Sequence, residues 1–410
     1  MSQPPGNRRL RVAVCFGGPS VEHDVSIISA QQLMSVLEER HEPVPVYLGR
    51  DGRWWTGDAL RDVGAFGPDE PAGGEPCELR LGTAGSPFVA PGGSRLKRDR
   101  DVVADVVVCA IHGTGGEDGT LLGALEHAGL PYAGGGVAAA AVAMDKALAK
   151  LVIGAAGIDV NPHALLTREE FSADPGAAAA RAAETAGLPC YAKPISLGSS
   201  IGVSHCADAA ELEEALELCF ELDRRALVEP ALDDAIEVNA AVLGRPGGEL
   251  LVSTLEQPVK GEGAALSFED KYLRGGKGGE GAKGSGAKEA GEPGGMASQD
   301  RLIPAPIPDD LAERIKGAAR RSHEALGFAG VVRYDFLVED PEGDSPRIVL
   351  NEPNTVPGSF AFYLFEPSGL PFVELAEGLI EIAFAEAAER RATTRTFESV
   401  LLSQHSGGGS

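Results

Sequence analysis

VVRYDFLVEDPEGDSPRIVLNEPNTVPG, residues 331–358, consists of two apolar runs joined by an acidic turn that is rich in Pro and Gly. We predict a strand for each run. Arg333 and Asp335 are two residues apart, as are Glu352 and Asn354, so each pair projects from one face of its strand. If the strands are neighbours, Asp335, Glu352 and Asn354 form the oxygen-rich ligand set that Mg²⁺ prefers, completed by phosphate oxygens. A solvated hairpin face is the alternative, but it does not explain why carboxylates interrupt runs apolar enough to be buried.

Composition predicts an acidic globular protein. With 410 residues, 43% of them hydrophobic, the chain can bury a large core and divide into about two or three domains. Its 36 Lys and Arg against 61 Asp and Glu give a net charge of −25, which argues against a nucleic-acid groove or an anionic membrane surface as partner. A site for an anionic nucleotide must therefore be built locally, from lysines, backbone N–H groups and metal.

The cysteines and the apolar runs bear on the compartment. The six cysteines show no CxxC spacing, and we interpret them as reduced core residues: Cys15, Cys77, Cys109, Cys190, Cys206 and Cys219. No run approaches the roughly 18 apolar residues of a membrane helix, so we expect a cytoplasmic protein.

The N-terminal part repeats short apolar strands with helical stretches between them, as in LRVAVCFG, VPVYLG and VVADVVVCAIHG, which predicts a parallel α/β sheet. Ligands bind beyond the carboxyl ends of such strands. Two polar clusters follow strands there: Ser20, Glu22 and Ser26, and then His112, Glu117 and Asp118. Either cluster alone is explained by helix capping. Together at equivalent strand ends they favour a site, whereas residues 60–100 look like a surface elaboration.

A second α/β unit begins near residue 135 with an Ala-rich helix carrying Lys146 and Lys150 one turn apart. Lys193 ends a predicted strand, and the small-residue turn that follows, Gly198 to Gly202, lets backbone approach phosphate oxygens, although a structural hairpin is the alternative. Of the next two predicted strands, the first ends at Glu229 and the second carries Glu237, with a short connector between them. This arrangement resembles the hinge segment of a nucleotide-binding site. Residues 275–295 contain ten glycines, which predicts a disordered insertion or a mobile lid.

Eight motifs resemble the D-alanine–D-alanine ligase family of ATP-grasp enzymes, in family order from about residue 10 to 390: GGPSVEHDVS, HGTGGEDGTLLG, MDKALAK, KPISLGSSIGVS, EVNAAVLG, FEDKY, VVRYDF and NEPNTVPG. The resemblance implies an α/β chain with an N-terminal Rossmann-like parallel-sheet domain and then a two-subdomain ATP-grasp fold, α+β in character. We place these units at 1–135, 136–228 and 229–404, with a lid loop at 268–298 and a tail at 405–410.

For the nucleotide, the resemblance implies phosphate contacts from Lys146, Lys193 and Ser200, an adenine site lined by Glu229, Ala231 and Leu232, and ribose contacts from Glu237. Asp335, Glu352 and Asn354 become ligands of two Mg²⁺ ions, with Mn²⁺ as a substitute.

For the amino acids, it implies that Glu22 orients the first substrate's ammonium and His112 its carboxylate. Arg333 and the N–H of Gly358 would stabilise the oxyanion of the tetrahedral intermediate, and Lys271 would contact the transferring phosphate. Glu22, Ser199 and Tyr272 resemble the family's hydrogen-bonded trio, which ties the N-terminal domain to the phosphate loop and the lid.

The implied reaction is ATP-dependent joining of two D-alanines through an acyl phosphate, for peptidoglycan precursor synthesis, by a homodimer. One departure bears on the acceptor. Tyr363 stands where many family members have a serine or small polar residue that receives the second substrate's carboxylate. A related ligase with another acceptor, in specialised metabolism, is therefore the alternative. A nucleotide-binding regulator without turnover would be expected to have lost Arg333, Lys271 or a metal carboxylate, and the sequence retains all of them.

Overall fold

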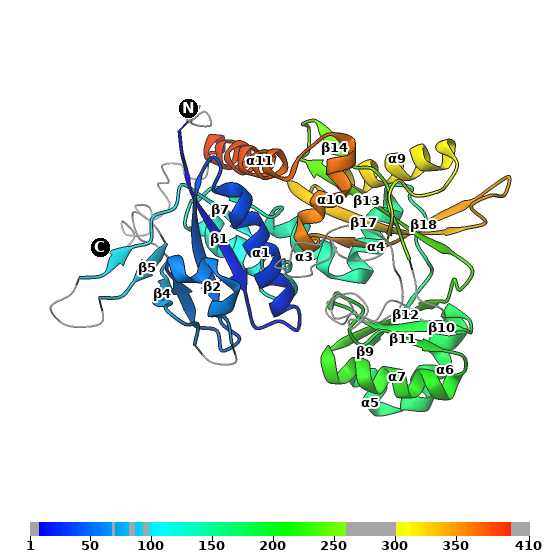
Figure 1. The fold of residues 1–410 in the computed structure, drawn as a ribbon. Coiled ribbons are helices and arrows are strands. Elements are labelled where there is room, and N and C mark those ends of the chain that lie inside the picture. The colour runs from blue at the N-terminus through cyan, green and yellow to red at the C-terminus, as the bar shows by residue number, and fades with distance from the viewer. Residues whose placement is uncertain (1–7, 68–69, 82–86, 93–97, 260–300, 395–410) are drawn as a thin grey trace, which may run out of the picture.

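The computed structural model describes residues 8–67, 70–81, 87–92, 98–259 and 301–394, which form three large β-sheets, a two-stranded ribbon and the helices around them (Figure 1). We refer to the sheets as N-terminal, central and C-terminal. The ribbon pairs β15 (Gln257–Pro258) with β16 (Arg301–Leu302). Within the described residues, no helix combines the length and the apolar character needed to cross a bilayer.

The N-terminal sheet has a parallel part made of β2 (Glu42–Leu48), β1 (Arg11–Gly17), β7 (Val106–Cys109) and β8 (Tyr132–Ala133), in that order. β7 is buried along its whole length and β1 along all but its first residue, which explains their unbroken apolar sequences. Helix α1 (His23–Leu37) follows β1, and α2 (Thr120–His127) follows β7. The predicted parallel sheet is confirmed.

Four short antiparallel strands extend this sheet beyond β2, a feature that the sequence did not predict. They are β3 (Trp54–Thr56), β4 (Glu75–Leu79), β5 (Phe88–Ala90) and β6 (Arg100–Asp101), and the 3-10 turns η1 (Asp58–Arg61) and η2 (Val63–Ala65) lie between β3 and β4. Strands of two to five residues are too short to show a clear alternating pattern in the sequence.

The C-terminal sheet is antiparallel, in the order β14 (Leu250–Val252), β13 (Ile236–Gly244), β17 (Gly330–Glu339) and β18 (Arg347–Asn354). One face packs on α3 (Val137–Met144), α4 (Lys146–Ala155) and α9 (Asp309–Leu326). Tyr334 and Phe336 of β17 belong to this core, so Arg333 and Asp335 face the other way. Pro353 is tolerated in β18 because this strand is at the sheet edge.

The prediction of a single Ala-rich helix is wrong, because the structure has two helices, α3 and α4, that are separated at Asp145. Asp145 is extended, with φ −85° and ψ 104°, and its carboxylate accepts hydrogen bonds from the N–H groups of Ala147 and Leu148 at 3.1 and 3.0 Å. It is the N-cap of α4, a role that outweighs the high helix propensity of the alanines around it.

The central sheet has its own small core. Its order is β11 (Ser204–Cys206), β10 (Cys190–Pro194), β12 (Arg225–Pro230) and β9 (Ala164–Thr167), with helices α5 (Arg168–Ala173), α6 (Pro175–Ala186) and α7 (Ala209–Leu222). Its hydrophobic cluster comes entirely from residues 164–228. In Figure 1 this unit lies apart from the others, below β17 and β18.

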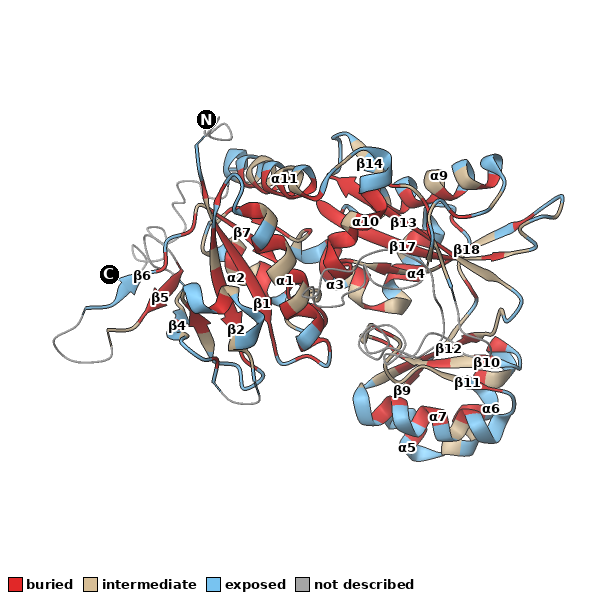
Figure 2. Ribbon diagram, in the orientation of Figure 1, coloured by how far each residue is buried: buried red, intermediate tan, exposed pale blue. Residues whose placement is uncertain are grey.

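The N-terminal and C-terminal sheets share one hydrophobic core instead. It joins β1 and β7 to β13 and β17 through α11 (Phe372–Ala392) and the segment that follows β18, which contains η5 (Gly358–Ala361), α10 (Phe362–Phe365) and η6 (Glu366–Ser368). Figure 2 shows the buried residues along these strands and on α11. All six cysteines are buried and free of disulfides, as predicted. The three-unit division of the chain stays a prediction.

Candidate active site

The predicted polar hairpin forms, and its two strands are neighbours. Asp335 of β17 lies opposite Glu352 of β18, and Arg333 lies opposite Asn354. The guanidinium of Arg333 donates two hydrogen bonds to Asp335, both of 2.7 Å, and Asn354 Nδ2 donates to Asp335 at 2.8 Å. The four side chains therefore meet on one face, as the spacing of the two pairs predicted.

A β-bulge follows Asp335, because Asp335 pairs with Glu352 but the next residue, Phe336, pairs with Leu350. The extra residue is Asn351. Its side-chain oxygen accepts a hydrogen bond from Lys193 at 3.1 Å and its carbonyl oxygen accepts one from Lys150 at 3.2 Å. Bulges often redirect side chains beside active sites, and this one turns Asn351 toward the lysines.

The hairpin's oxygen donors fit a hard cation such as Mg²⁺. Burial raises the pKa of Asp335 to about 6, with Arg333 opposing that rise. The described residues contain no group of three His, Cys, Asp or Glu side chains placed to hold a metal. Two carboxylates and one amide oxygen, from Asp335, Glu352 and Asn354, are an incomplete shell, which suits a metal whose remaining ligands are phosphate oxygens and water.

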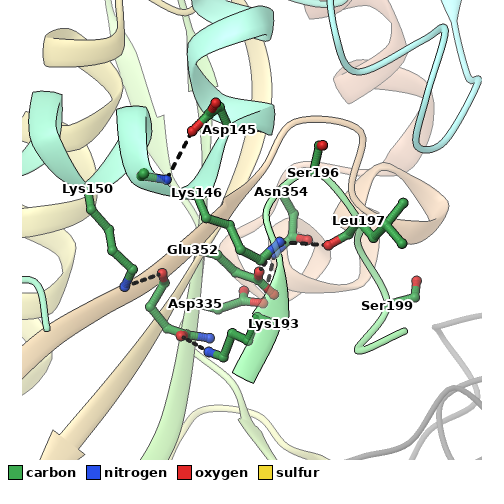
Figure 3. A network of polar contacts seen from close by, with 12 residues as sticks. Asp145, Lys146, Lys150, Lys193, Ser196, Leu197, Ser199, Asp335, Glu352 and Asn354 are labelled. Carbon is green, nitrogen blue, oxygen red and sulfur yellow. Dashed lines mark hydrogen bonds and ion pairs between the residues drawn. The ribbon is translucent and has the colours of Figure 1, made fainter. Parts of the chain in front are cut away.

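Three lysines converge beside these carboxylates, as Figure 3 shows for Lys146, Lys150 and Lys193. Lys146 Nζ lies 3.3 Å from Glu352 and donates to the carbonyl oxygen of Leu197 at 2.6 Å. Lys150 Nζ lies 2.9 Å from one oxygen of Glu229, and Lys193 contacts the other.

These ion pairs are buried, and their pKa values reflect it. Burial raises the pKa of Glu229, but Lys193 and Lys150 offset this and bring it to about 2. Burial lowers the pKa of Lys150, whereas Glu229 and Glu352 outweigh burial at Lys193 and raise its pKa. Sequence reasoning gave Lys150 no role. Its place one helical turn after Lys146 was the available signal.

The turn after β10 has the backbone expected of a phosphate-binding loop. Ser199 and Ser200 have φ values of 53° and 59°, a left-handed conformation that is costly for residues other than Gly. The hydroxyl of Ser199 donates to Glu22 of the N-terminal domain. Two members of the predicted trio therefore meet, while Tyr272 and Lys271 lie outside the described residues.

Two strand ends of the N-terminal sheet bring Glu22 and His112 to the same region. A Cβ at Gly113 would lie only 2.3 Å from Ser20 Oγ and 2.9 Å from Glu22 Oε2, so only Gly fits between the two clusters. His112 Nε2 lies 3.1 Å from Ser29 Oγ. Burial, with Arg333 nearby, lowers the pKa of His112 to about 3. The imidazole of His112 is therefore neutral near pH 7.

Other members of these clusters have structural contacts. Ser26 Oγ accepts from the N–H of Gly17 at 2.8 Å and donates to the Ala110 carbonyl at 2.6 Å. Asp118 accepts from the N–H groups of Gly115 and Thr120, both at 2.9 Å. The contact of Asp118 with the first residue of α2 agrees with the capping interpretation, whereas Ser26 lies inside α1 and links the end of β1 to the residue after β7.

Glu117, which lies between β7 and α2, links this part of the chain to the loop after β18, a role that sequence reasoning missed. Its carboxylate accepts from the N–H of Gly113 at 2.7 Å, from the hydroxyl of Thr355 at 3.0 Å and from the N–H of Val356 at 2.8 Å. A further hydrogen bond to the segment after β18 runs from the N–H of Ser359 to Ser29 Oγ of α1, at 3.0 Å. These contacts set the position of the segment that contains Gly358.

After Gly358 the chain turns left-handed for three residues, Ser359, Phe360 and Ala361, with φ between 53° and 55°. Consecutive residues of this kind are rare outside functional segments. The turn ends at α10, which carries Tyr363, a buried side chain whose hydroxyl points toward Glu256 at 3.5 Å.

The remaining predicted nucleotide contacts lie in the connection from β12 to β13 and at the start of β13. Ala231 donates its N–H to the Pro189 carbonyl at 3.0 Å, and Leu232 follows it. Glu237 of β13 lies on the polar face and accepts from Asn239 at 3.3 Å.

Comparison with known proteins identifies the family. The model of the D-ala D-ala ligase N-terminus matches residues 11–135, and that of the C-terminus matches 152–282 and 295–381. The chain belongs to the D-alanine–D-alanine ligase family. It is 35% identical over 390 residues to the D-alanine–D-alanine ligase of Chlorobium limicola, covering 92% of this chain and 97% of that one. For the Chlorobaculum tepidum enzyme the identity is 36%, and the two coverages are 93% and 98%.

Solved structures of this ligase family agree. The D-alanine–D-alanine ligase of Coxiella burnetii matches with a TM-score of 0.73 and 26% identity, over 93% of this chain and 96% of that one. The VanG D-Ala:D-Ser ligase of Enterococcus faecalis matches with a TM-score of 0.71 and 27% identity, over 92% and 100%. The predicted family and fold class are confirmed.

Proposed function

We propose that this protein is an ATP-dependent carbon–nitrogen ligase that joins two D-alanines into D-alanyl-D-alanine for peptidoglycan precursor synthesis. The observation that carries the proposal is that two sets of residues adjoin the hairpin that carries Arg333 and Asp335. Lys146 pairs with Glu352 of this hairpin and Lys193 donates to its Asn351, while His112 is close enough to Arg333 for that charge to lower its pKa. Lys146, Lys193 and the hairpin carboxylates suit phosphates and metal, and Glu22 and His112 suit an amino acid. The curated relatives named above are D-alanine–D-alanine ligases, so they give no support to the specialised-metabolism alternative.

The first step is phosphoryl transfer. A carboxylate oxygen of the first D-alanine attacks the γ-phosphorus of ATP, and ADP leaves, which gives D-alanyl phosphate. Lys146, Lys193 and the loop at Ser199 and Ser200 would bind the phosphates, with Lys271 as a further contact. Glu229, Ala231 and Leu232 would line the adenine, and Glu237 the ribose. Asp335, Glu352 and Asn354 would hold two Mg²⁺ ions, or Mn²⁺, whose chemistry is to neutralise phosphate charge.

The second step is acyl transfer. The amine of the second D-alanine attacks the carbonyl carbon, a tetrahedral oxyanion forms, and phosphate leaves as the amine loses a proton. Arg333 and the N–H of Gly358 would stabilise the oxyanion. Glu22 would orient the ammonium of the first D-alanine in both steps, and neutral His112 would donate a hydrogen bond to its carboxylate before phosphorylation. Tyr272, with Glu22 and Ser199, would keep water from the acyl phosphate.

The test is to incubate purified protein with ATP, Mg²⁺ and single or paired D- and L-amino acids, and to measure phosphate release together with product mass. D-Alanine alone should give D-alanyl-D-alanine and phosphate in equal amounts, and omission of ATP should abolish both. If D-alanine alone gives no dipeptide while another pair does, the proposed substrate is wrong.

We also propose a cytoplasmic homodimer. The proposal is supported by the family and by the need for ATP as a substrate. Sedimentation at micromolar concentration should give twice the mass of one chain, whereas a single-chain mass would contradict the dimer.

A further inference from the structure

Another buried ion pair lies near the polar face of the C-terminal sheet, apart from the lysines. Arg301 of β16 donates from Nη1 to Glu256 at 2.7 Å, and their side chains are only 9% and 2% exposed. The guanidinium carbon of Arg301 lies 4.0 Å from the ring centroid of Tyr363. We define the Arg301 cluster as Arg301, Glu256, Tyr363 and Asn239.

Glu256 holds this cluster together. While one of its oxygens pairs with Arg301, the other accepts from Asn239 at 3.2 Å and from the hydroxyl of Tyr363 at 3.5 Å. Backbone bonds between Glu256 and Asn239, of 2.9 and 3.0 Å, fix the segment to β13. The guanidinium is therefore held between a carboxylate on one side and an aromatic face on the other, an arrangement that restricts its motion.

The cluster adjoins the residues proposed for acyl transfer. Asn239 lies directly opposite Asp335 in the pairing of β13 with β17. Burial lowers the pKa of Arg333, but Asp335, Tyr363 and Glu256 outweigh it and hold the pKa well above its usual value. Tyr363 is also only five residues after Gly358.

A second amino acid entering here must place its carboxylate in a largely buried site, which is costly without a positive partner. By the resemblance described above, Tyr363 stands where many family members have a serine or small polar residue for this carboxylate. Its own hydroxyl is directed at Glu256. Arg301 supplies a positive charge there, with its guanidinium carbon 4.0 Å from the centre of the Tyr363 ring. A guanidinium has five N–H donors in a planar fork, so it can bind Glu256 and a second carboxylate together.

We propose that Arg301 determines acceptor specificity by binding the carboxylate of the second amino acid, while Glu256 and Tyr363 hold the guanidinium in place. This inference rests on the proposed function. The class of acceptor it selects is a small amino acid with a free α-carboxylate, in preference to amides of the same size.

The test is a competition between D-alanine and D-alaninamide for the same acyl phosphate. The ratio of the two products, measured by mass spectrometry, reports acceptor choice independently of the first step. Because Arg301→Gln alone would leave Glu256 buried without its cation, the main variant is the double one, Arg301→Gln with Glu256→Gln. We expect the product ratio to shift toward the amide by at least about 30-fold, the effect of losing a buried charge-assisted contact.

Two further variants make the comparison specific. Arg301→Lys keeps a cation opposite Glu256 and should shift the ratio in the same direction but by less. The matched control is Arg347→Gln with Glu339→Gln, which neutralises an exposed Arg–Glu pair of 2.8 Å on the β17–β18 hairpin and should leave the ratio at the wild-type value.

Trapping with hydroxylamine separates the two proposals, because it converts D-alanyl phosphate into D-alanine hydroxamate. If the wild-type protein forms no ATP-dependent hydroxamate, the proposed function fails, and this inference fails with it. If hydroxamate forms but the double variant and Arg301→Lys both keep the wild-type product ratio, only the role of Arg301 is wrong.

Discussion

The C-terminal sheet has two interfaces, and they are built from different forces. Toward the N-terminal sheet it shares a continuous hydrophobic core, to which Glu117 and Ser29 add hydrogen bonds. Toward the central sheet the contacts are charged or polar, such as those of Glu229 with Lys150, Lys193 with Asn351, and Arg225 with Asp145. The proposed amino-acid residues border the first interface, and the proposed nucleotide residues border the second.

The two interfaces also differ in whether their polar side chains would keep their partners when the substrates bind. Phosphates bound at the second interface would compete with Glu229 and Glu352 for Lys193 and Lys146, so ion pairs there must open when nucleotide binds. At the first interface, Glu117 and Ser29 already hold the segment around Gly358, and nothing in the proposed reaction requires those bonds to change. Binding of nucleotide at the second interface, the nucleotide end of the site, would therefore depend on charge. Binding of the amino acids at the first interface, the amino-acid end, would depend on preorganised geometry.

The largest effect is expected at the nucleotide end, from Glu352→Gln. This change removes the charge that faces Lys146 and one of the proposed metal ligands, while shape is nearly kept. Turnover should fall at least about 100-fold, or ~3 kcal/mol in the activation barrier, with the fold intact. Glu342→Gln, in the exposed turn of the same hairpin, is the control and should keep near-normal turnover. Near-normal turnover of Glu352→Gln at saturating Mg²⁺ would exclude the residue as an essential ligand.

Next in size is Lys150→Met, which tests how far the second interface depends on ion pairs. The change leaves buried Glu229 with Lys193 as its remaining lysine partner. The free energy of unfolding should fall by about 3 kcal/mol, the cost of breaking a buried pair. Because Lys193 is then held more strongly by Glu229, the KM for ATP should also rise.

Lys316→Met is the control for this experiment, because Lys316 forms an exposed pair with Glu313 and should matter by less than about 0.5 kcal/mol. Equal stability of the two variants in urea titrations would show that the charged interface adds nothing to folding.

The smallest effect concerns His112 at the amino-acid end, through pH. Its pKa is about 3 in the folded protein and about 6.5 when unfolded, so below pH 6.5 the unfolded state binds more protons. Stability is therefore lost as pH falls from about 6.5 toward 3. Between pH 7 and 5.5 this residue alone should account for about 1 kcal/mol.

His112→Gln should remove that part of the pH dependence. Denaturant titrations of both proteins at the two pH values measure it. A parallel loss of stability in both would mean that His112 is not held neutral.

The parts of the candidate site also differ in how far the sequence predicted them. Alternation in residues 331–358 was enough to place Arg333, Asp335, Glu352 and Asn354 on one face, because strand periodicity is local. The resemblance located Glu22 and Ser199, which are 177 residues apart in sequence. The sequence placed Glu117 in a polar cluster but did not predict its partners, and neither signal identified Glu256 or Arg301, because these contacts depend on how the loops pack. The break at Asp145 was missed because a side-chain cap outweighed propensity.

The central claim is that a carboxylate of D-alanine is phosphorylated and that the amine of the second D-alanine then displaces the phosphate. Isotope transfer tests this claim most directly. D-Alanine labelled with ¹⁸O in both carboxylate oxygens is incubated with unlabelled ATP and Mg²⁺, and the phosphate and nucleotide products are weighed by mass spectrometry. We predict one ¹⁸O in each phosphate released, one phosphate for each D-alanyl-D-alanine formed, and unlabelled ADP. Dipeptide accompanied by unlabelled phosphate, with the ¹⁸O in AMP or water instead, would contradict the acyl-phosphate reaction.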